Sequence, residues 1–185
     1  MSGQVWQESW RADPVARRLA DRHYNRQSVG AKQFVPPGRC VVLRAGVAAA
    51  WITSWPFAEF VRHQWAGAWV NSLFRNESEH LSSGMITLAV AATLAVWPEP
   101  PPLGIVSFVD STKVRRKRDP GRCYRKAGWQ HVGYTKGGLL AFQQLPDAMP
   151  CPLPALTDQI DLFAAVEPSG VEPLAVSTPD RGDQT

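Results

Sequence analysis

The chain has few cysteines and no long hydrophobic run. Three cysteines among 185 residues are too few and too scattered for a disulfide framework or an all-cysteine zinc site, and they favour a reducing compartment. The longest apolar run covers residues 85–97 and is shorter than the roughly 20 residues that a membrane-spanning helix needs. The first residues lack the apolar core of a secretion signal. We therefore expect a cytoplasmic protein without a membrane partner.

Histidine is also scarce, and charge is unevenly distributed. The four histidines show no spacing typical of a zinc site. Residues 1–145 carry 19 basic and nine acidic side chains, whereas residues 146–185 carry one basic and seven acidic side chains and seven of the 16 prolines. A proline-rich acidic segment buries too little apolar surface to offset the entropy lost on ordering. The sequence thus predicts one catalytic domain over 1–145 and a mostly disordered, extended tail over 146–185.

The hydrophobic pattern of the first 145 residues predicts an α/β (α+β) fold with a mixed central sheet flanked by helices. Asp13 followed by Pro14 is typical of a helix start. A polar loop over 23–39 is long enough to suggest a functional role. The predicted helices cover residues 14–22, 81–97 and 120–127, and the predicted strands cover residues 40–43, 48–55, 68–74, 103–109, 130–135 and 139–144.

The most specific local pattern is Y-x-x-x-G-W, which begins at Tyr124 on the short predicted helix and leads directly into a strand. This pattern resembles the last conserved segment of GNAT-fold acyltransferases. The resemblance implies that Tyr124 lies near the thioester sulfur of an acyl donor and acts as a general acid. The alternative is a tyrosine that packs a helix against the core.

A second element of that family is a strand, a tight turn and a helix whose N-terminus holds a pyrophosphate. Here the strand over 68–74 leads into Arg75, and serines 82 and 83 begin the long helix, where anions are favoured. The glycine signature of acetyl-CoA users is absent, and Glu77 and Glu79 would repel phosphate. The resemblance implies acetyl-CoA or a related acyl donor, with Arg75, Ser82 and Ser83 expected to bind it, while the missing glycine signature sets this chain apart from standard acetyl-CoA users. The alternative is an ordinary capped helix.

Three short strings together resemble one divergent branch of this superfamily, the phage DNA-modification proteins of the Mom type. The strings are HYNR at residues 23–26, FRNE at 74–77 with LSS at 81–83, and VSFVD at 106–110, and the resemblance spans about residues 21–144. It implies a GNAT-like fold, modification of adenine N6 in DNA, an anti-restriction role in a phage-infected or bacterial host cell, and possible use of iron. The matching positions, which the resemblance implies are site residues, are His23, Tyr24, Arg26, Arg75, Ser107, Asp110 and Tyr124.

A dense basic segment follows the strand over 103–109. Nine lysines and arginines lie between residues 113 and 136. Such clustering beside a candidate active site is the electrostatic pattern of polyanion binding, and it predicts double-stranded DNA as the partner. A solvated surface, or contacts to a coenzyme A phosphate, are the alternatives. The expected DNA-binding residues are Arg26, Lys113, Arg115, Arg116, Lys117, Arg118 and Arg122.

These patterns support one main hypothesis and two rivals. The main hypothesis is a GNAT-like transferase that modifies a nucleobase amine in DNA. Asp110 or His23 would remove the proton of the amine, and Tyr124 would act on the leaving group. The first rival is an acetyl-CoA-dependent N-acetyltransferase of a small amine. The second is a non-enzymatic, DNA-binding phage accessory protein that has kept the fold and lost the chemistry.

Overall fold

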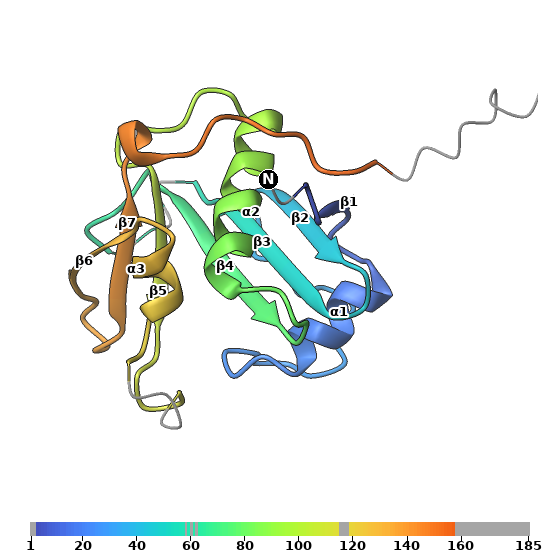
Figure 1. Ribbon diagram of the computed structural model, residues 1–185. Coiled ribbons are helices and arrows are strands. Elements are labelled where there is room, and N and C mark those ends of the chain that lie inside the picture. The colour runs from blue at the N-terminus through green and yellow to red at the C-terminus, as the bar shows by residue number, and fades with distance from the viewer. Residues whose placement is uncertain (1–2, 58, 60, 62, 115–118, 158–185) are drawn as a thin grey trace, which may run out of the picture.

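The computed structural model describes residues 3–57, 59, 61, 63–114 and 119–157. Seven strands form one sheet in the order β1-β2-β3-β4-β5-β7-β6 (Figure 1). The strands are β1 (Gln7–Ser9), β2 (Arg39–Ala45), β3 (Ala49–Trp55), β4 (Trp69–Asn76), β5 (Ile105–Val109), β6 (Gln130–Tyr134) and β7 (Leu140–Gln144). The helices are α1 (Pro14–Asp21), α2 (Ser82–Val96), α3 (Arg122–Lys126) and a short 3-10 turn, η2 (Pro146–Ala148). The predicted mixed α+β fold is confirmed.

One junction of the sheet is parallel and short. Strands β1 to β4 pair antiparallel, and so do β5, β7 and β6. Strand β4 pairs with β5 in parallel only where Trp69–Asn71 lie beside Ile105–Ser107. The pairing of β4 with β3 also shifts register between Ile52 and Thr53, which are partners of Leu73 and Asn71. Beyond Asn71, strand β4 therefore continues beside β3 alone, and the sheet opens between β4 and β5.

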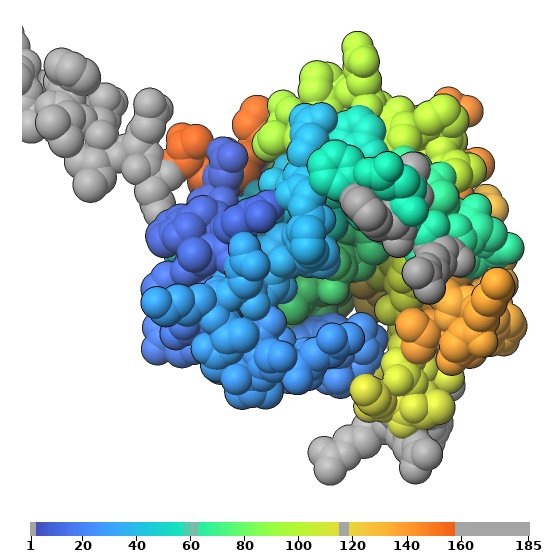
Figure 2. Space-filling model, turned by 180° about the vertical axis from the view of Figure 1, so that it is seen from behind, coloured from blue at the N-terminus to red at the C-terminus, as the bar shows by residue number. Residues whose placement is uncertain are grey.

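The helices cover both faces of the sheet. Helices α2 and α3 pack on one face, where the main core gathers around Trp51, Trp69 and Ile86. Helix α1 packs on the opposite face over β3 and β4, around Leu19 and Ile52. Seen from behind, the surface is hollowed between the blue N-terminal segment and the yellow and orange C-terminal segments, with green atoms at the bottom of the hollow (Figure 2).

The element boundaries have local physical causes. The Asp13 carboxylate accepts hydrogen bonds from the amides of Val15 (2.7 Å) and Ala16 (3.4 Å), which confirms the predicted start of α1. Strand β5 starts at Ile105 rather than at 103, because Gly104 turns the chain with a φ of +61°. A Cβ at Gly104 would lie 2.0 Å from the Gln144 carbonyl oxygen, so only glycine fits there.

The structure adds order at both ends of the described chain. Strand β1 was not expected from the sequence. It pairs with β2, and Leu156 bridges to its other edge in parallel. The Leu156 amide donates to the Trp6 carbonyl (2.8 Å), and the Leu153 amide donates to the Ala91 carbonyl of α2 (3.0 Å). Residues 146–157 thus run extended along the domain, whereas the rest of the predicted tail, residues 158–185, lies outside the described residues.

Within the described part of the chain, the structure has no helix with the length and apolar character required to cross a membrane.

Candidate functional site

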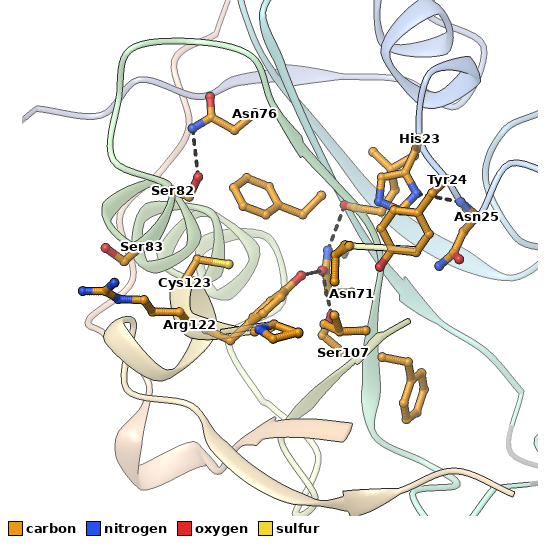
Figure 3. Close-up of a pocket in the computed structure, with 18 of the residues that line it drawn as sticks. His23, Tyr24, Asn25, Asn71, Asn76, Ser82, Ser83, Ser107, Arg122 and Cys123 are labelled. Carbon is orange, nitrogen blue, oxygen red and sulfur yellow. Dashed lines mark hydrogen bonds between the residues drawn. The ribbon is translucent and has the colours of Figure 1, made fainter. Parts of the chain in front are cut away.

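A cleft of about 640 Å³ lies where β4 and β5 separate. Its walls come from the two strands, the start of α2, helix α3 and the loop that follows α1. Figure 3 shows the side chains of these elements pointing into the same space. The predicted site residues that line the cleft are His23, Tyr24, Ser82, Ser83, Ser107, Arg122 and Tyr124.

The floor of the cleft holds a buried hydrogen-bond network centred on Asn71. The Tyr124 hydroxyl donates to Asn71 Oδ1 (2.7 Å), and the Ser107 hydroxyl donates to the same oxygen (3.1 Å). Asn71 Nδ2 donates to the carbonyls of Ile52 (3.1 Å) and Leu73 (2.9 Å). These four bonds fix the orientation of the amide, because both of its donors and its acceptor oxygen are used. Asn71 thereby sets the direction of both hydroxyls.

Helix α3 places Tyr124 on this floor. The helix begins after Gly121, whose φ is +80° and whose added Cβ would lie 2.1 Å from the Phe142 ring. The Tyr124 ring stacks on Phe142 (centroids 5.7 Å apart) and meets Trp129 edge-on. Burial raises the pKa of the Tyr124 hydroxyl well above its usual value, so the phenol stays protonated. The structure therefore offers a neutral hydrogen-bond donor at this position.

His23 and Tyr24 join the loop after α1 to both open strands. The two rings stack with their centroids 4.4 Å apart. His23 Nδ1 accepts from the Asn25 amide (3.2 Å), and the ring is also hydrogen-bonded to the Phe74 backbone on β4. The Tyr24 hydroxyl is hydrogen-bonded to the backbone of Asp110, directly after β5. The pair thus spans the mouth of the gap between the strands.

Burial and the nearby Arg75 guanidinium lower the pKa of His23 to about 4. The imidazole is therefore neutral at physiological pH. With one nitrogen accepting from Asn25 and the ring also bonded to the Phe74 backbone, His23 has little capacity left to take a proton from a substrate. Its position favours a structural role, holding the loop against β4.

Arg75 does not line the cleft. Its guanidinium contacts Glu77 (2.5 Å) and the Arg22 carbonyl, and Arg22 forms a two-pronged ion pair with the same carboxylate (2.8 and 2.9 Å). Hydrogen bonds from Arg22 and then from Arg75 lower the pKa of Glu77 to about 2. The charge of Glu77 is therefore neutralised by two arginines, which removes the repulsion that the sequence predicted between Glu77 and phosphate.

The N-terminus of α2 opens into the cleft. No side chain caps it: Leu81 is the capping residue, and the Met85 amide makes the first intrahelical bond, to the Leu81 carbonyl (3.0 Å). The amides of Ser82, Ser83 and Gly84 therefore have no partner within the helix. Asn76 orients Ser82 through a hydrogen bond to its hydroxyl (3.1 Å). These residues fit a phosphate group, because backbone donors and the helix dipole favour negative charge there.

The predicted DNA-binding residues that the structure describes lie in two places. Arg122 lines the cleft together with Lys126, and Lys113 reaches the Tyr24 carbonyl (3.4 Å). Arg26 lies elsewhere: its guanidinium pairs with Asp21 (2.8 Å) inside the loop after α1. The remaining predicted DNA-binding residues, Arg115, Arg116, Lys117 and Arg118, lie outside the described residues.

Asp110 lies at the end of β5 rather than among the residues that line the cleft. Its Oδ1 accepts from the Thr112 hydroxyl (2.6 Å) and amide (2.9 Å), and its Oδ2 is 4.0 Å from Lys113 Nζ. These contacts, with the Thr112 hydroxyl first, lower the pKa of Asp110, so the carboxylate is ionised at neutral pH. Within the residues that the structure describes, no three His, Cys, Asp or Glu side chains come together. The described residues of the cleft therefore do not fit an iron site.

Asn71 is the site residue that sequence reasoning missed. A signal was present, because asparagine is depleted in strands and Asn71 interrupts the strand AWVNSLF between large apolar residues. In the structure its side chain is 5% exposed. A buried amide in a strand needs partners, and here those partners are the two hydroxyls that line the cleft.

Comparisons with protein-family models, with curated proteins and with solved structures gave no match to this chain.

Proposed function

We propose that this protein is a GNAT-like transferase that moves an acyl-type group from an activated donor to a nucleobase amine in DNA. The observation that carries the proposal is the Tyr124–Asn71–Ser107 network, which lies in the cleft opposite the uncapped N-terminus of α2. Three elements follow one another in the order that the family resemblance implies. They are strand β4, which separates from the parallel β5, helix α2, which begins beside that opening, and helix α3, which carries Tyr124 and leads into β6.

The donor supplies, when bound, an acyl-type group on a leaving group such as a thiol. In this proposal Ser82 and Ser83 hold its phosphate through their amides and hydroxyls. Tyr124 faces the leaving atom. Because burial raises its pKa above that of a thiol, the phenol stabilises the departing anion by donating a hydrogen bond rather than by losing its proton. A rotation about the C–O bond redirects the hydroxyl from Asn71 to the leaving atom.

The acceptor amine must lose a proton as it forms its new bond. The sequence suggested Asp110 or His23 as the group that takes this proton, and both lie near the end where β4 and β5 separate. His23, however, already has a hydrogen-bond partner on each side of its ring. Asp110 directly follows Val109, which lines the cleft, and its carboxylate is ionised. Among the residues that the structure describes, its Oδ2 has only Lys113 nearby, at 4.0 Å. We therefore assign the proton to Asp110 and a positioning role to His23.

DNA as the acceptor is supported by charge. Arg122 and Lys126 are exposed at the cleft and form no ion pair with any residue in the described ranges. Lys113 extends the same positive surface toward Tyr24. Unpaired cations at the edge of a cleft attract phosphates, and such contacts make affinity fall steeply as salt rises.

The test is nucleoside mass spectrometry of DNA from bacteria that express the chain. We expect a new modified nucleoside with the wild type and about a 100-fold loss with Tyr124→Phe, because one hydrogen-bond donor to the developing charge is removed. Tyr134→Phe is the matched control, since Tyr134 is 63% exposed on β6 and outside the cleft. Equal circular dichroism and a cooperative thermal transition well above the growth temperature would show that the variants fold.

Each rival predicts a different result in the same experiment. A small-amine acetyltransferase would leave the DNA unmodified, and it would release free coenzyme A from acetyl-CoA only when an amine is supplied to accept the acetyl group. A DNA-binding protein without chemistry would bind duplex DNA, and Tyr124→Phe would have no effect. An unmodified genome in a host that carries the natural donor would contradict the proposal.

A further inference from the structure

A second cavity, of about 310 Å³, lies next to the cleft on the face covered by α1. It is formed by the loop after α1 and by β4. Four of its residues also line the cleft: His23, Asn25, Ser72 and Leu73. The two cavities are therefore separated by single side chains, and a ligand in the second can present one edge to the first. We call the second cavity the amide pocket.

The loop that forms the amide pocket is built around Arg26. The guanidinium donates to Asp21 Oδ1 (2.8 Å), to the Ala31 carbonyl (2.8 Å) and to the Gln33 carbonyl (3.1 Å). The side chains of Arg26 and Asp21 are only 11% and 17% exposed. The loop is thus held in shape before any ligand binds, and the charge of Arg26 is already neutralised.

The remaining lining is uncharged and combines polar side chains with the apolar residues Ala20, Val35, Pro36 and Leu73. Asn25, Gln27 and Gln33 supply primary amides, and Phe34, which is 8% exposed, supplies an aromatic surface. His23 is neutral because its pKa is low. Among the residues that the structure describes, no lysine and no acidic residue lines the pocket. A phosphate would find no free cation here, whereas an uncharged heteroaromatic ring would find an aromatic surface and amide donors and acceptors.

We infer that the amide pocket takes the acceptor base after it leaves the DNA stack, and that Asn25 recognises the base by its amino group and the adjacent ring nitrogen. This inference rests on the proposed function. Asn25 lies at the boundary of both cavities, and its side chain makes no hydrogen bond to any residue in the described part of the chain. An asparagine amide pairs in two-pronged fashion with an amino group and a neighbouring ring nitrogen, as in adenine.

The geometry explains how recognition and reaction are combined. A base buried in duplex DNA cannot reach a cleft floor, so an enzyme that acts on it must extrude it. In the amide pocket the ring lies beside Phe34, and Asn25 holds the amino group at the boundary with the cleft. The volume of the amide pocket is at the lower end of the range for ligand sites, which suits one base rather than a longer strand.

The test compares affinities and needs no donor. Fluorescence anisotropy is measured with short duplexes in which one adenine faces either thymine or an abasic site. Because unpairing is already complete opposite the abasic site, we expect the wild type to bind that duplex about tenfold more tightly. Asn25→Leu and Gln33→Leu should lose this preference and keep their affinity for the fully paired duplex, which phosphate contacts set. Gln64→Leu, an exposed amide outside both cavities, is the matched control.

Each outcome has a distinct meaning. If the wild type shows no preference, or if both leucine variants keep it, the amide pocket does not hold the base. A preference that is equally strong when thymine replaces the unpaired adenine would also overturn the role of Asn25, because thymine has no amino group. Failure to bind any duplex would instead contradict the proposed function. If mass spectrometry finds the modified nucleoside but anisotropy shows no preference for the unpaired adenine, the proposed function stands and only this inference fails.

Discussion

The two ends of strand β4 are held in different ways. At its start, Trp69 pairs with β5, and Val70 and Asn71 pair with strands on both sides. Trp69 is fully buried, and its ring lies 5.9 Å from that of Trp55 and 5.4 Å from that of Trp97. At its end, residues 73–76 pair with β3 alone. Ion pairs and single hydrogen bonds from the loops around α1 and α2 support that end.

The difference shows how a stable sheet can hold an open site. Apolar packing needs no partner of specific geometry, and it closes the sheet wherever large side chains meet. Polar contacts are directional, and they support a strand without filling the space beside it. Asn71 is the last residue of β4 that pairs with β5, so it marks the change from apolar packing to support by polar contacts. The predictions below test this contrast.

The largest effect is expected at the closed end. Replacing Trp69 with alanine should lower the free energy of unfolding by about 3–5 kcal/mol, because a large buried ring is removed from an aromatic cluster. Phe74→Ala, at the open end, should cost clearly less, since Phe74 is half-buried and borders the cleft. Urea unfolding measures both. Equal losses would mean that the two ends are held alike.

Asn71→Leu should remove the network at the boundary. The Tyr124 and Ser107 hydroxyls would lose their acceptor in a buried site, which costs about 1–3 kcal/mol. In combination with Tyr124→Phe the two losses should not add, because both substitutions break the same bond. Asn76→Ala, at the open end of the strand, is the comparison: its loss should add to that of Tyr124→Phe, because Asn76 bonds to Ser82 and the His80 carbonyl rather than to Tyr124. Additive losses in a double-mutant cycle would show that Asn71 does not act through Tyr124.

His23 should make the open end sensitive to pH. Its folded pKa of about 4 lies below the unfolded value near 6.5, so the unfolded chain binds more protons between these pH values. Stability should therefore rise by about 2–3 kcal/mol as the pH increases from 4 to 6.5 and change little above that range. In His23→Gln this rise should be absent. A rise of the same size in the variant would assign it to another group.

Glu77→Gln should have the smallest effect. The carboxylate is about one-third exposed, so its ion pairs with Arg22 and Arg75 contribute only about 0.5–1 kcal/mol at neutral pH. The folded pKa is depressed to about 2, so this contribution is present above the unfolded pKa near 4.5 and is lost as the pH falls toward 2. Thermal melts of both proteins should converge in acid. A difference that persists at pH 2 would require a packing role for Glu77.

Sequence patterns were sufficient for most of the fold. The turn residues and the alternation of apolar side chains predicted β2 to β7 and all three α-helices within a few residues. Strand β1 was missed because three residues are too short for a periodic signal, and its register depends on Leu43 and on Leu156, which are remote in sequence. The short helix predicted over 120–127 begins later, at Arg122, because Gly121 is its N-terminal cap and Asp119 pairs with Arg125.

The candidate site was predictable in composition but not in arrangement. His23, Tyr24, Ser107 and Tyr124 meet in one cleft as the motifs suggest. No pattern in the sequence shows that Arg75 is bound to Glu77, because that pairing depends on where Arg22 ends the first helix. The role of Asn71 depends in the same way on the register shift in β4, which is a property of the paired strands rather than of either strand alone.

The contact between Trp6 and Leu156 brings the two ends of the described chain to one edge of the sheet. In a chain shortened to residues 3–157, a linker between these two residues would close the backbone into a ring at this edge of the sheet. New ends could then be opened at the β2–β3 turn, where Val47 is 74% exposed and Gly46 makes the bend. A circularly permuted chain that begins and ends at this turn should therefore keep the same arrangement of strands and helices.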